Sequence, residues 1–269
     1  MIKVAVIGAA GRMGKALVSN IAASETLTLS GAVEHPACPA LGQDAGVVAG
    51  VAPQGITITS DLDSVLADGK TDVVINFATA GVRECAEAAV KANAAIVIGA
   101  TILTAEDRAC FKSLAENGGR LVVAGNMSIG VNLLFKLAKE AALLLGDGAD
   151  VEIIEMHHNQ KKDAPSGTAA RLAEVICEAR DWSYEEDVRH GRVGVTGVRS
   201  KKEIGMHSLR GGDVVGDHTV VFALEGERVE LTHKASNRNN FARGALRAAE
   251  YLASAAPGLY DMQDVLGLK

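Results

Sequence analysis

The segment HHNQKKDAPSGT, residues 157–168, gathers residue types that could move a proton beside a bound anion. Imidazoles exchange protons near neutral pH, and His157 and His158 supply two of them. Ammonium groups and helix N-termini attract anions. Lys161, Lys162 and a Pro-Ser-Gly-Thr helix start lie within a few residues of the imidazoles. The segment therefore predicts a site for an anionic substrate that gains or loses a proton.

The helix start predicts where a carboxylate would bind. Pro165 suits the first turn of a helix, and a Ser or Asp nearby suits its cap. The amides of Ser166, Gly167 and Thr168 are then expected to be unpaired donors that a carboxylate can use. Gly167 leaves room for close approach, and Lys161 can pair with a carboxylate or deliver a proton.

Structural roles are the alternative for several of these residues. A lone histidine at a strand end is more often structural than catalytic, but two beside a cationic helix start favour function. His157 and His158 end a predicted strand, so their side chains should point to opposite sides. Lys162 is expected to be a solvated charge, and Asp163 a helix cap or a residue that fixes the loop. No metal-ligand spacing accompanies the histidines, so we expect no metal site.

The elements that must position this segment begin with a βαβ unit. Apolar β-branched residues predict a strand at 2–7, helical periodicity follows, and alternation predicts a second strand at 27–33. After an expected loop at 36–55, strands are predicted at 55–59, 72–77, 95–98 and 121–124, and helices at 82–92 and 104–116. This alternation predicts an α/β fold with a doubly wound parallel sheet.

The pattern changes after residue 127, where we place a domain boundary. Helices are expected at 129–145, from 166 to about 179, and at 241–253 before a short tail. Strands are expected at 151–156, 203–209, 213–223 and 228–233, and residues 181–200 are polar and rich in glycine. Adjacent strands without intervening helices predict a mixed or antiparallel sheet in an α+β domain.

The glycine turn after the first strand indicates a dinucleotide site. It reads Gly8-Ala9-Ala10-Gly11-Arg12-Met13-Gly14. Glycines let the backbone approach a pyrophosphate, and the helix that starts there directs free N–H groups at it. The G-x-x-G-x-x-G spacing departs slightly from the usual pattern and could be a structural turn. Its place directly after an N-terminal strand favours the cofactor.

A carboxylate at the end of the second strand bears on the choice of cofactor. Glu34 can accept hydrogen bonds from both adenine-ribose hydroxyls, which favours NAD(H), and would repel the 2′-phosphate of NADP(H). A solvated acid at a strand end is the alternative. His35 and Arg12 could partly offset a 2′-phosphate, so we expect NADH to be favoured with some use of NADPH. Two small-residue loops, Gly99-Ala100-Thr101 and Ala124-Gly125-Asn126-Met127, would line the ligand crevice of such a sheet, or serve only as turns.

Composition argues against several classes of function. The 269 residues suit one large or two modest domains. Aromatic residues make up 3% of the chain and the net charge is −6 without a long basic run, which argues against nucleic-acid binding. The apolar runs are too short and too often broken by charge to span a membrane. The chain shows no signal-peptide pattern, and its scattered cysteines fit a reducing compartment, so a cytoplasmic protein is expected.

Five segments spread along the chain carry a family resemblance. They are GAAGRMG at 8–14, SIGVN at 128–132, EIIEMHHNQKKDAPSGT at 152–168, GDVVGDHTV at 212–220 and THKASNR at 232–238. With them, the chain resembles the 4-hydroxy-tetrahydrodipicolinate reductases, also called dihydrodipicolinate reductases, of the bacterial diaminopimelate–lysine pathway. The string E-x-H-H-x-x-K-x-D-A-P-S-G-T is far more specific than the glycine turn.

The resemblance implies roles for the matching residues. His157 would be the catalytic proton donor or acceptor with Lys161 as its partner, and His158, Gly167 and Thr168 would bind a dicarboxylate substrate. The segment 8–13, Glu34 and the loops 99–101 and 124–127 would bind NADH or NADPH. In the implied reaction, hydride passes to C4 of a conjugated imine ring formed by loss of water, and the resulting enamine is protonated at C3.

The resemblance also implies the domain organisation. A Rossmann-type dinucleotide-binding domain would span 1–127, with the C-terminal segment 240–269 packed back on it. A substrate-binding and oligomerisation domain would span 128–239, and its sheet would assemble a homotetramer. Ala100, Met127 and His35 depart from residues common in the family, namely Thr, Phe and Arg. The alternatives are another two-domain NAD(P)-dependent dehydrogenase of amino-acid metabolism, which would leave the 157–168 segment unexplained, and a non-catalytic NAD(H)-sensing protein.

Overall fold

The computed structural model describes residues 1–101 and 103–269 and divides the chain into two compact units. Unit 1 contains Met1–Ile129 and Arg238–Lys269, and unit 2 contains Gly130–Asn237. Within the described residues, no helix combines the length and the apolar character that crossing a membrane requires.

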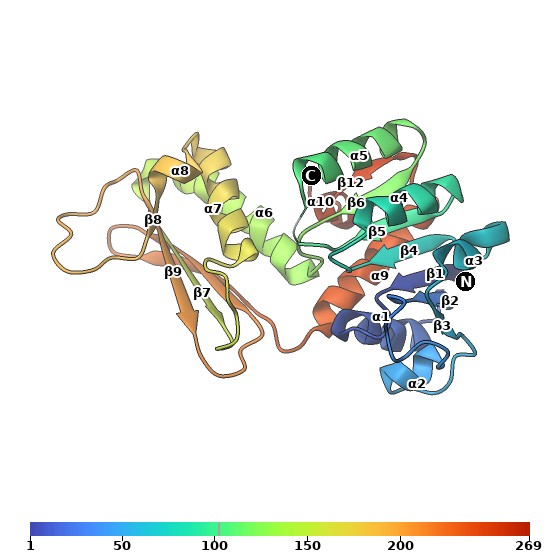
Figure 1. Cartoon of the computed structure of the whole chain (residues 1–269). Helices are drawn as coiled ribbons and strands as arrows, with labels where there is room; N and C mark the ends of the chain where they lie inside the picture. The colour runs from blue at the N-terminus through green and yellow to red at the C-terminus, as the bar shows by residue number, and fades with distance from the viewer. Residues whose placement is uncertain (102) are drawn as a thin grey trace. The chain divides into compact units, whose positions relative to one another are not determined.

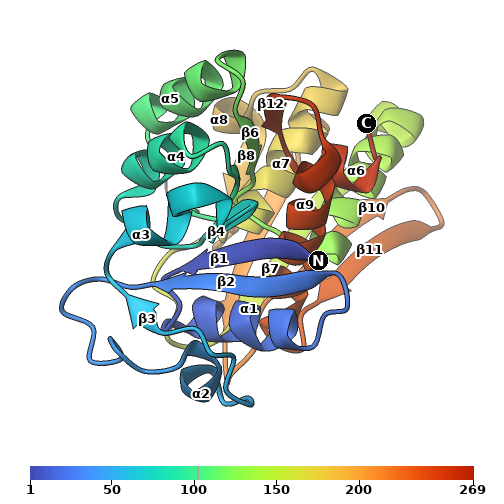
Figure 2. The same cartoon turned by 90° about the vertical axis from the view of Figure 1, so that its right-hand side faces the viewer.

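Unit 1 is a seven-stranded parallel sheet with helices on both faces (Figures 1 and 2). The strand order is β12-β6-β5-β4-β1-β2-β3. The strands are β1 (Ile2–Ile7), β2 (Leu27–Val33), β3 (Ile58–Thr59), β4 (Val73–Asn76), β5 (Ala95–Ile98), β6 (Arg120–Val123) and β12 (Gly258–Tyr260). The helices are α1 (Arg12–Ala22), α2 (Ala45–Ala49), α3 (Leu62–Leu66), η1 (Ala67–Gly69), α4 (Val82–Lys91), α5 (Ala105–Glu116), α9 (Asn239–Ser254) and α10 (Met262–Leu266).

Alternate residues of the central strands face two separate cores. Val73 and Ile75 of β4 pack with residues of α1 and α9, whereas Val74 between them packs with residues of α4 and α5. Successive side chains of a strand point to opposite faces, so a strand covered on both sides needs a continuous apolar run. The four residues of β4 are all buried. The predicted doubly wound parallel sheet is therefore confirmed.

Unit 2 is a five-stranded mixed sheet of order β11-β10-β7-β9-β8, with α6 and α7 packed on one face. The strands are β7 (Asp150–His157), β8 (Val188–His190), β9 (Ile204–Arg210), β10 (Asp217–Ala223) and β11 (Arg228–Lys234). The helices are α6 (Ile129–Leu145), η2 (Gly146–Gly148), α7 (Gly167–Arg180) and α8 (Tyr184–Asp187). Strand β7 pairs antiparallel with β10 and parallel with β9, which confirms the predicted mixed sheet.

Several short elements differ from the sequence prediction. The expected loop at 36–55 contains α2, whose N-cap Asp44 accepts hydrogen bonds from two amides of its first turn. The expected strand at 55–59 shortens to β3, and the one at 213–223 begins only at Asp217. The polar stretch 181–200 contains α8 and β8, and the expected tail contains β12 and α10. Elements of two to five residues carry too little periodicity to be recognised.

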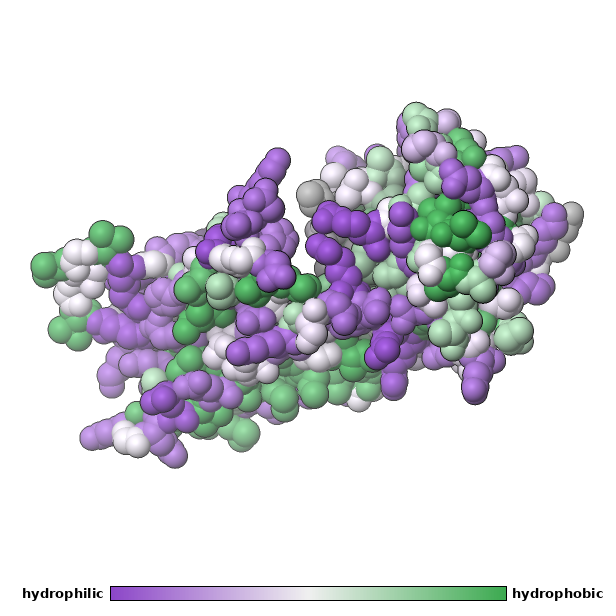
Figure 3. All heavy atoms as spheres, turned by 90° about the horizontal axis from the view of Figure 1, so that it is seen from below, coloured by the Kyte–Doolittle hydropathy of each residue, from purple (hydrophilic) through white to green (hydrophobic). Residues whose placement is uncertain are grey.

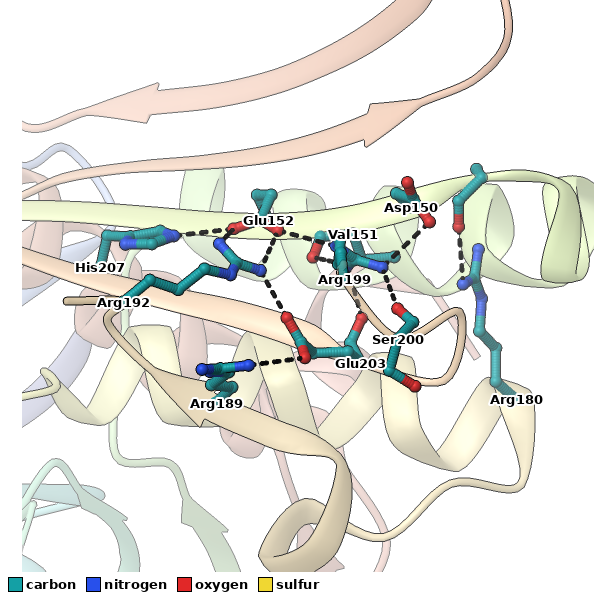
Figure 4. A network of polar contacts seen from close by, with 11 residues as sticks. Asp150, Val151, Glu152, Arg180, Arg189, Arg192, Arg199, Ser200, Glu203 and His207 are labelled. Carbon is teal, nitrogen blue, oxygen red and sulfur yellow. Dashed lines mark hydrogen bonds and ion pairs between the residues drawn. The ribbon is translucent and has the colours of Figure 1, made fainter. Parts of the chain in front are cut away.

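A network of charged residues holds the segment 191–203 to the outer face of the unit 2 sheet (Figure 4). Glu152 accepts hydrogen bonds from Arg192 at 3.0 and 2.7 Å, from Arg199 at 3.1 Å and from His207 at 2.7 Å. Partial burial would raise the pKa of Glu152, but these donors outweigh it and lower the pKa to about 2. Glu152 is therefore ionised at neutral pH and anchors the segment.

The segment that this network anchors carries exposed apolar side chains. Val193, Val195 and Val198 are almost fully exposed, each beside a glycine with positive φ. Apolar spheres gather at the left end of Figure 3, where the segment projects. A contiguous exposed apolar patch can mark a site of contact with another protein.

Helix α9 approaches the loop after β6 so closely that only glycine fits at the contact. A Cβ on Gly244 would lie 1.7 Å from the carbonyl oxygen of Met127. Met127 is buried and belongs to the same apolar core as α9. Glycine inside a helix costs about 1 kcal/mol relative to alanine, so this close approach is what favours glycine here.

We expect Gly244→Ala to lower the midpoint of thermal unfolding by several degrees. Overpacking a core costs roughly 1–3 kcal/mol, and each kcal/mol corresponds to about 2–4 °C in a chain of this class. Gly148→Ala is the matched control, because no atom lies within 4 Å of a Cβ built there. Calorimetry of both variants measures the difference. A midpoint for Gly244→Ala at or above that of the wild type would contradict the packing argument.

Candidate active site

The inner face of the unit 2 sheet changes from apolar to polar towards the end of β7. Ile153 is fully buried in the core beneath α7, and the next residues on the same face are Glu155 and His157. The register places Arg210 of β9 beside His157 and His218 of β10 opposite Glu155. A cluster of titratable side chains therefore lies where the sheet meets the start of α7.

Glu155 is the centre of this cluster. Its side chain is 0% exposed and accepts hydrogen bonds from His157 Nδ1 at 2.6 Å, from Arg210 Nη1 and Nη2 at 2.8 and 2.9 Å, and from the Ser166 amide at 3.2 Å. Burial alone would raise the pKa of Glu155, but the hydrogen bonds from Arg210, His157 and Ser208 outweigh it and lower the pKa. The carboxylate is therefore ionised at neutral pH.

The ionised carboxylate decides which nitrogen of His157 carries the proton. A carboxylate without a proton can only accept, so His157 Nδ1 must donate. Nε2 is then the nitrogen left for a substrate, and it lies 3.0 Å from where a Cβ on Gly216 would stand. Burial lowers the pKa of His157 and Glu155 raises it, and with the positive charges of Lys161 and Arg210 the pKa is lowered overall.

The start of α7 differs from the prediction in two respects, the position of Pro165 and the partner of the Ser166 amide. Ser166 is the N-cap, with Pro165 outside the helix, and its hydroxyl accepts a hydrogen bond from the Ala169 amide at 3.1 Å. The prediction that the Ser166 amide is an unpaired donor is wrong, because it donates to Glu155. Gly167 is the first helical residue, and a Cβ there would have no atom within 4 Å. Room for a ligand therefore remains at Gly167, followed by Thr168.

Lys161 and His158 lie in the loop between β7 and α7. Lys161 Nζ donates to both carboxylate oxygens of Asp163 at 2.9 and 2.8 Å, so Asp163 fixes this loop. The backbone of His158 donates to the Val214 carbonyl at 2.7 Å, whereas its buried ring Nδ1 has no hydrogen-bond partner among the described residues. A buried polar atom without a partner is uncommon and is a mark of a ligand or water site.

Three of the clustered residues were not singled out from the sequence. Glu155 could have been found, because it precedes His157 by two residues and so shares its face of the strand. Arg210 and His218 lie more than fifty residues away along the chain and meet Glu155 only through strand register. Burial chiefly, with the charge on His157, lowers the pKa of His218 to about 3, so its ring is neutral and packs edge-on against His157 at 5.2 Å.

In unit 1, the glycine turn joins β1 to α1 as the spacing predicts. Gly8 has φ +73°, and a Cβ on Gly14 would lie 2.0 Å from the Gly8 carbonyl oxygen. The N-cap Gly11 provides no side-chain cap, so the amides of Arg12 and Met13 are not capped by it. An uncapped helix N-terminus directs N–H groups and a positive dipole at an anion. The turn therefore fits a pyrophosphate.

Glu34 follows β2 directly and lies beside this turn. Its Oε1 accepts a hydrogen bond from the Ala10 amide at 2.8 Å, and Oε2 accepts one from the His35 amide at 3.1 Å. Ala9 is buried, and its amide donates to the Val33 carbonyl at 3.2 Å. The carboxylate is therefore held at the position where an adenine ribose would meet the turn.

The two small-residue loops follow β5 and β6 at the same edge of the sheet as the glycine turn, since all these strands are parallel. Gly99 donates to the Asn76 carbonyl, and a Cβ there would lie 2.4 Å from the Phe77 ring. Asn126 accepts a hydrogen bond from the Ser128 amide at 2.9 Å. Of the remaining loop residues, Ala100 and Met127 are buried, Ala124 is half-buried, and Thr101 and Gly125 are exposed. Across the part of the chain that the structure describes, no cluster of His, Cys, Asp and Glu could hold a metal ion.

Comparisons with known proteins match nearly the whole chain to one family. The family models described as dihydrodipicolinate reductase, N-terminus, and dihydrodipicolinate reductase, C-terminus, match residues 2–127 and 130–266. The 4-hydroxy-tetrahydrodipicolinate reductase of Syntrophotalea carbinolica is 54% identical, with 100% of each chain covered.

Solved structures give the same result. The dipicolinate-bound dihydrodipicolinate reductase from Paenisporosarcina sp. TG-14 is similar with a TM-score of 0.78 and 30% identity, over 98% of each chain. GenD2 from gentamicin A biosynthesis, solved in complex with NAD, has a TM-score of 0.64 at 14% identity over 99% of this chain and 90% of its own, and so shares the fold alone. From these matches along both units, the chain belongs to the dihydrodipicolinate reductase family.

Proposed function

We propose that this protein reduces 4-hydroxy-tetrahydrodipicolinate to tetrahydrodipicolinate with NADH or NADPH, in diaminopimelate and lysine biosynthesis. The observation that carries the proposal is His157, held through Nδ1 by a buried carboxylate, beside Lys161 and the start of α7. Family membership and the names of full-length relatives support it.

The residues of unit 2 would supply a proton and hold the substrate. His157 exchanges the proton at C3 of the reduced ring through Nε2, because Nδ1 is occupied by Glu155. Lys161 is the catalytic partner of His157 in this step, and its counter-ion Asp163 lies in the same loop. One substrate carboxylate binds at Gly167 and Thr168, where the helix dipole stabilises it. His158, with its unpaired buried nitrogen, contributes to the same anion site.

The residues of unit 1 would hold the cofactor. A bound nicotinamide dinucleotide supplies the hydride. Gly8, Ala9, Ala10, Gly11, Arg12 and Met13 surround the pyrophosphate, and Glu34 accepts hydrogen bonds from the adenine ribose. The loops 99–101 and 124–127 line the crevice on the nicotinamide side. Glu34 favours NADH over NADPH, because a 2′-phosphate would lie against its negative charge.

Residues 1–127 with 240–269 would form the dinucleotide-binding domain, and residues 128–239 the domain that binds substrate and assembles a homotetramer. Exposed apolar side chains support assembly through unit 2. They include Ile154 and Leu209 on the outer sheet face and Val195 in the segment 191–203. All four cysteines are free thiols, which fits a cytoplasmic enzyme.

The activity is tested with freshly prepared 4-hydroxy-tetrahydrodipicolinate and NADH, followed by loss of NADH absorbance. We expect His157→Gln and Lys161→Ala each to lower kcat by about 10²–10⁴-fold, the usual contribution of a positioned proton donor. NADH affinity, measured by fluorescence titration, should survive. Lys162→Ala, a change of the exposed neighbouring lysine, is the control and should keep normal turnover.

Two outcomes would contradict this assignment. If the wild-type protein binds NADH but consumes none with the substrate, a non-catalytic NAD(H)-sensing role is favoured. If either variant keeps wild-type turnover, the role given to that residue is wrong.

Cofactor choice is tested with Glu34→Gln. The amide retains an oxygen that can accept from the Ala10 amide but removes the negative charge. We expect the ratio of kcat/KM for NADPH to that for NADH to rise by about tenfold or more, since one charge near a phosphate is worth roughly 1–4 kcal/mol. Glu25→Gln, at the opposite end of β2, is the control. An unchanged ratio in Glu34→Gln would remove Glu34 from cofactor selection.

Assembly is tested by sedimentation of the purified protein. We expect a species with the mass of four chains, and expect Val195→Asp to shift it towards smaller species, because a charge would have to be buried at the contact. Glu227→Gln, in an exposed turn between β10 and β11, is the control for surface change. A wild-type protein that sediments as a single chain would exclude the tetramer.

A further inference from the structure

One buried carboxylate contacts or connects three parts of the candidate site in unit 2: His157, the start of α7 and the loop that carries Lys161. Glu155 accepts from the proton-exchanging histidine through His157 Nδ1 and from the start of the anion-binding helix through the Ser166 amide. Arg210 holds the same carboxylate with two parallel hydrogen bonds. Two parallel bonds between guanidinium and carboxylate fix direction as well as distance.

Arg210 extends this connection to the loop that carries Lys161. Its Nη2 also donates to the Asp163 carbonyl oxygen at 2.6 Å, and the Asp163 carboxylate binds Lys161 Nζ. A single chain of contacts therefore runs from Lys161 through Asp163 and Arg210 to Glu155, and on to His157. Moving Glu155 would move all three parts of the site.

The charges explain why both members of the ion pair are required. A buried carboxylate without a partner is strongly destabilised. Arg210 lets Glu155 stay ionised even while His157 is neutral, and Glu155 then stabilises the additional charge when His157 gains a proton. An anion beside a histidine favours the charged form of the ring.

We propose that Glu155 is the positioning residue of the site: paired with Arg210, it holds His157 with the proton on Nδ1, raises its affinity for a second proton on Nε2, and keeps the start of α7 aligned with it. The inference rests on the proposed function for the reaction that His157 serves. The tautomer and the proton affinity are properties of the protein without substrate.

The groups that face His157 come from four elements. Glu155 lies on its own strand β7, Arg210 on β9, and His218 on β10. Lys161 lies in the loop before α7 and acts on His157 through its charge. His233 of β11 lies opposite His218, and its charge lowers the pKa of His218. Among these groups, only Glu155 is negative and in direct contact with His157. Removing its charge should therefore lower the pKa of His157.

The test is a pH titration of the histidine rings by NMR on ¹⁵N-labelled protein, with His157 assigned from the spectrum of His157→Gln. In the wild type we expect Nδ1 protonated and Nε2 unprotonated above the midpoint. In Glu155→Gln we expect the His157 midpoint to fall by about 1 pH unit or more, the usual effect of one adjacent charge. The limb of the pH–rate profile that reports His157 should fall with it, and kcat by about tenfold or more.

One further variant completes the comparison. Glu152→Gln is the matched control: Glu152 lies on the same strand and also binds an arginine and a histidine, but on the outer face (Figure 4). It should leave the His157 midpoint unchanged.

Each outcome decides the question. A wild-type spectrum with the proton on Nε2 overturns the proposal and needs no variant. A folded Glu155→Gln with an unchanged His157 midpoint and an unshifted rate profile, however low its kcat, shows a merely structural role and also overturns it. If NADH is not consumed at all, the proposed function fails while the NMR midpoints still test Glu155.

Discussion

The ion pair between the buried Glu155 and the half-buried Arg210 is the interaction on which the candidate site depends. Taking two charges out of water costs several kcal/mol for each, and only good geometry and further hydrogen bonds repay that cost. Here Arg210 binds both carboxylate oxygens, and His157, Ser166 and Ser208 also donate to Glu155. A carboxylate with so many donors is held in one position. It in turn positions His157 and the start of α7, which both donate to it.

Strand β7 carries two clusters of the same composition on opposite faces. Glu155 with Arg210 and His157 lies inside, and Glu152 with Arg192 and His207 lies outside. The odd spacing between the two glutamates puts them on different sides of the sheet. Their exposure separates their roles. Glu155 is 0% exposed and connects residues of the candidate site, whereas the Glu152 side chain is 23% exposed and ties a surface segment to the sheet.

Sequence patterns predict those parts of the candidate site whose residues lie close together in the chain. The glycine turn and residues 157–168 each lie in one short stretch, and the long strands and helices have clear periodicity. Arg210 and His218 reach Glu155 through strand pairings that join distant segments, and no spacing along the chain encodes that register. The pattern of a helix start by itself predicts that the Ser166 amide is available to a ligand. The structure shows that a carboxylate of the neighbouring strand already occupies it.

The geometry around Glu34 also constrains how the protein could accept NADPH. Its Oε1 accepts from the Ala10 amide inside the glycine turn, so the carboxylate is tied to the backbone that would receive the pyrophosphate. Turning away from a 2′-phosphate would leave that amide unpaired, at the cost of a lost hydrogen bond to a charged group. Acceptance of NADPH would then depend on cations that can approach the phosphate. Arg12 is exposed at the start of α1, two residues after Ala10, and His35 follows Glu34 directly in the chain. Under the proposed function, the fixed Glu34 carboxylate would therefore be the group that sets the selectivity between NADH and NADPH.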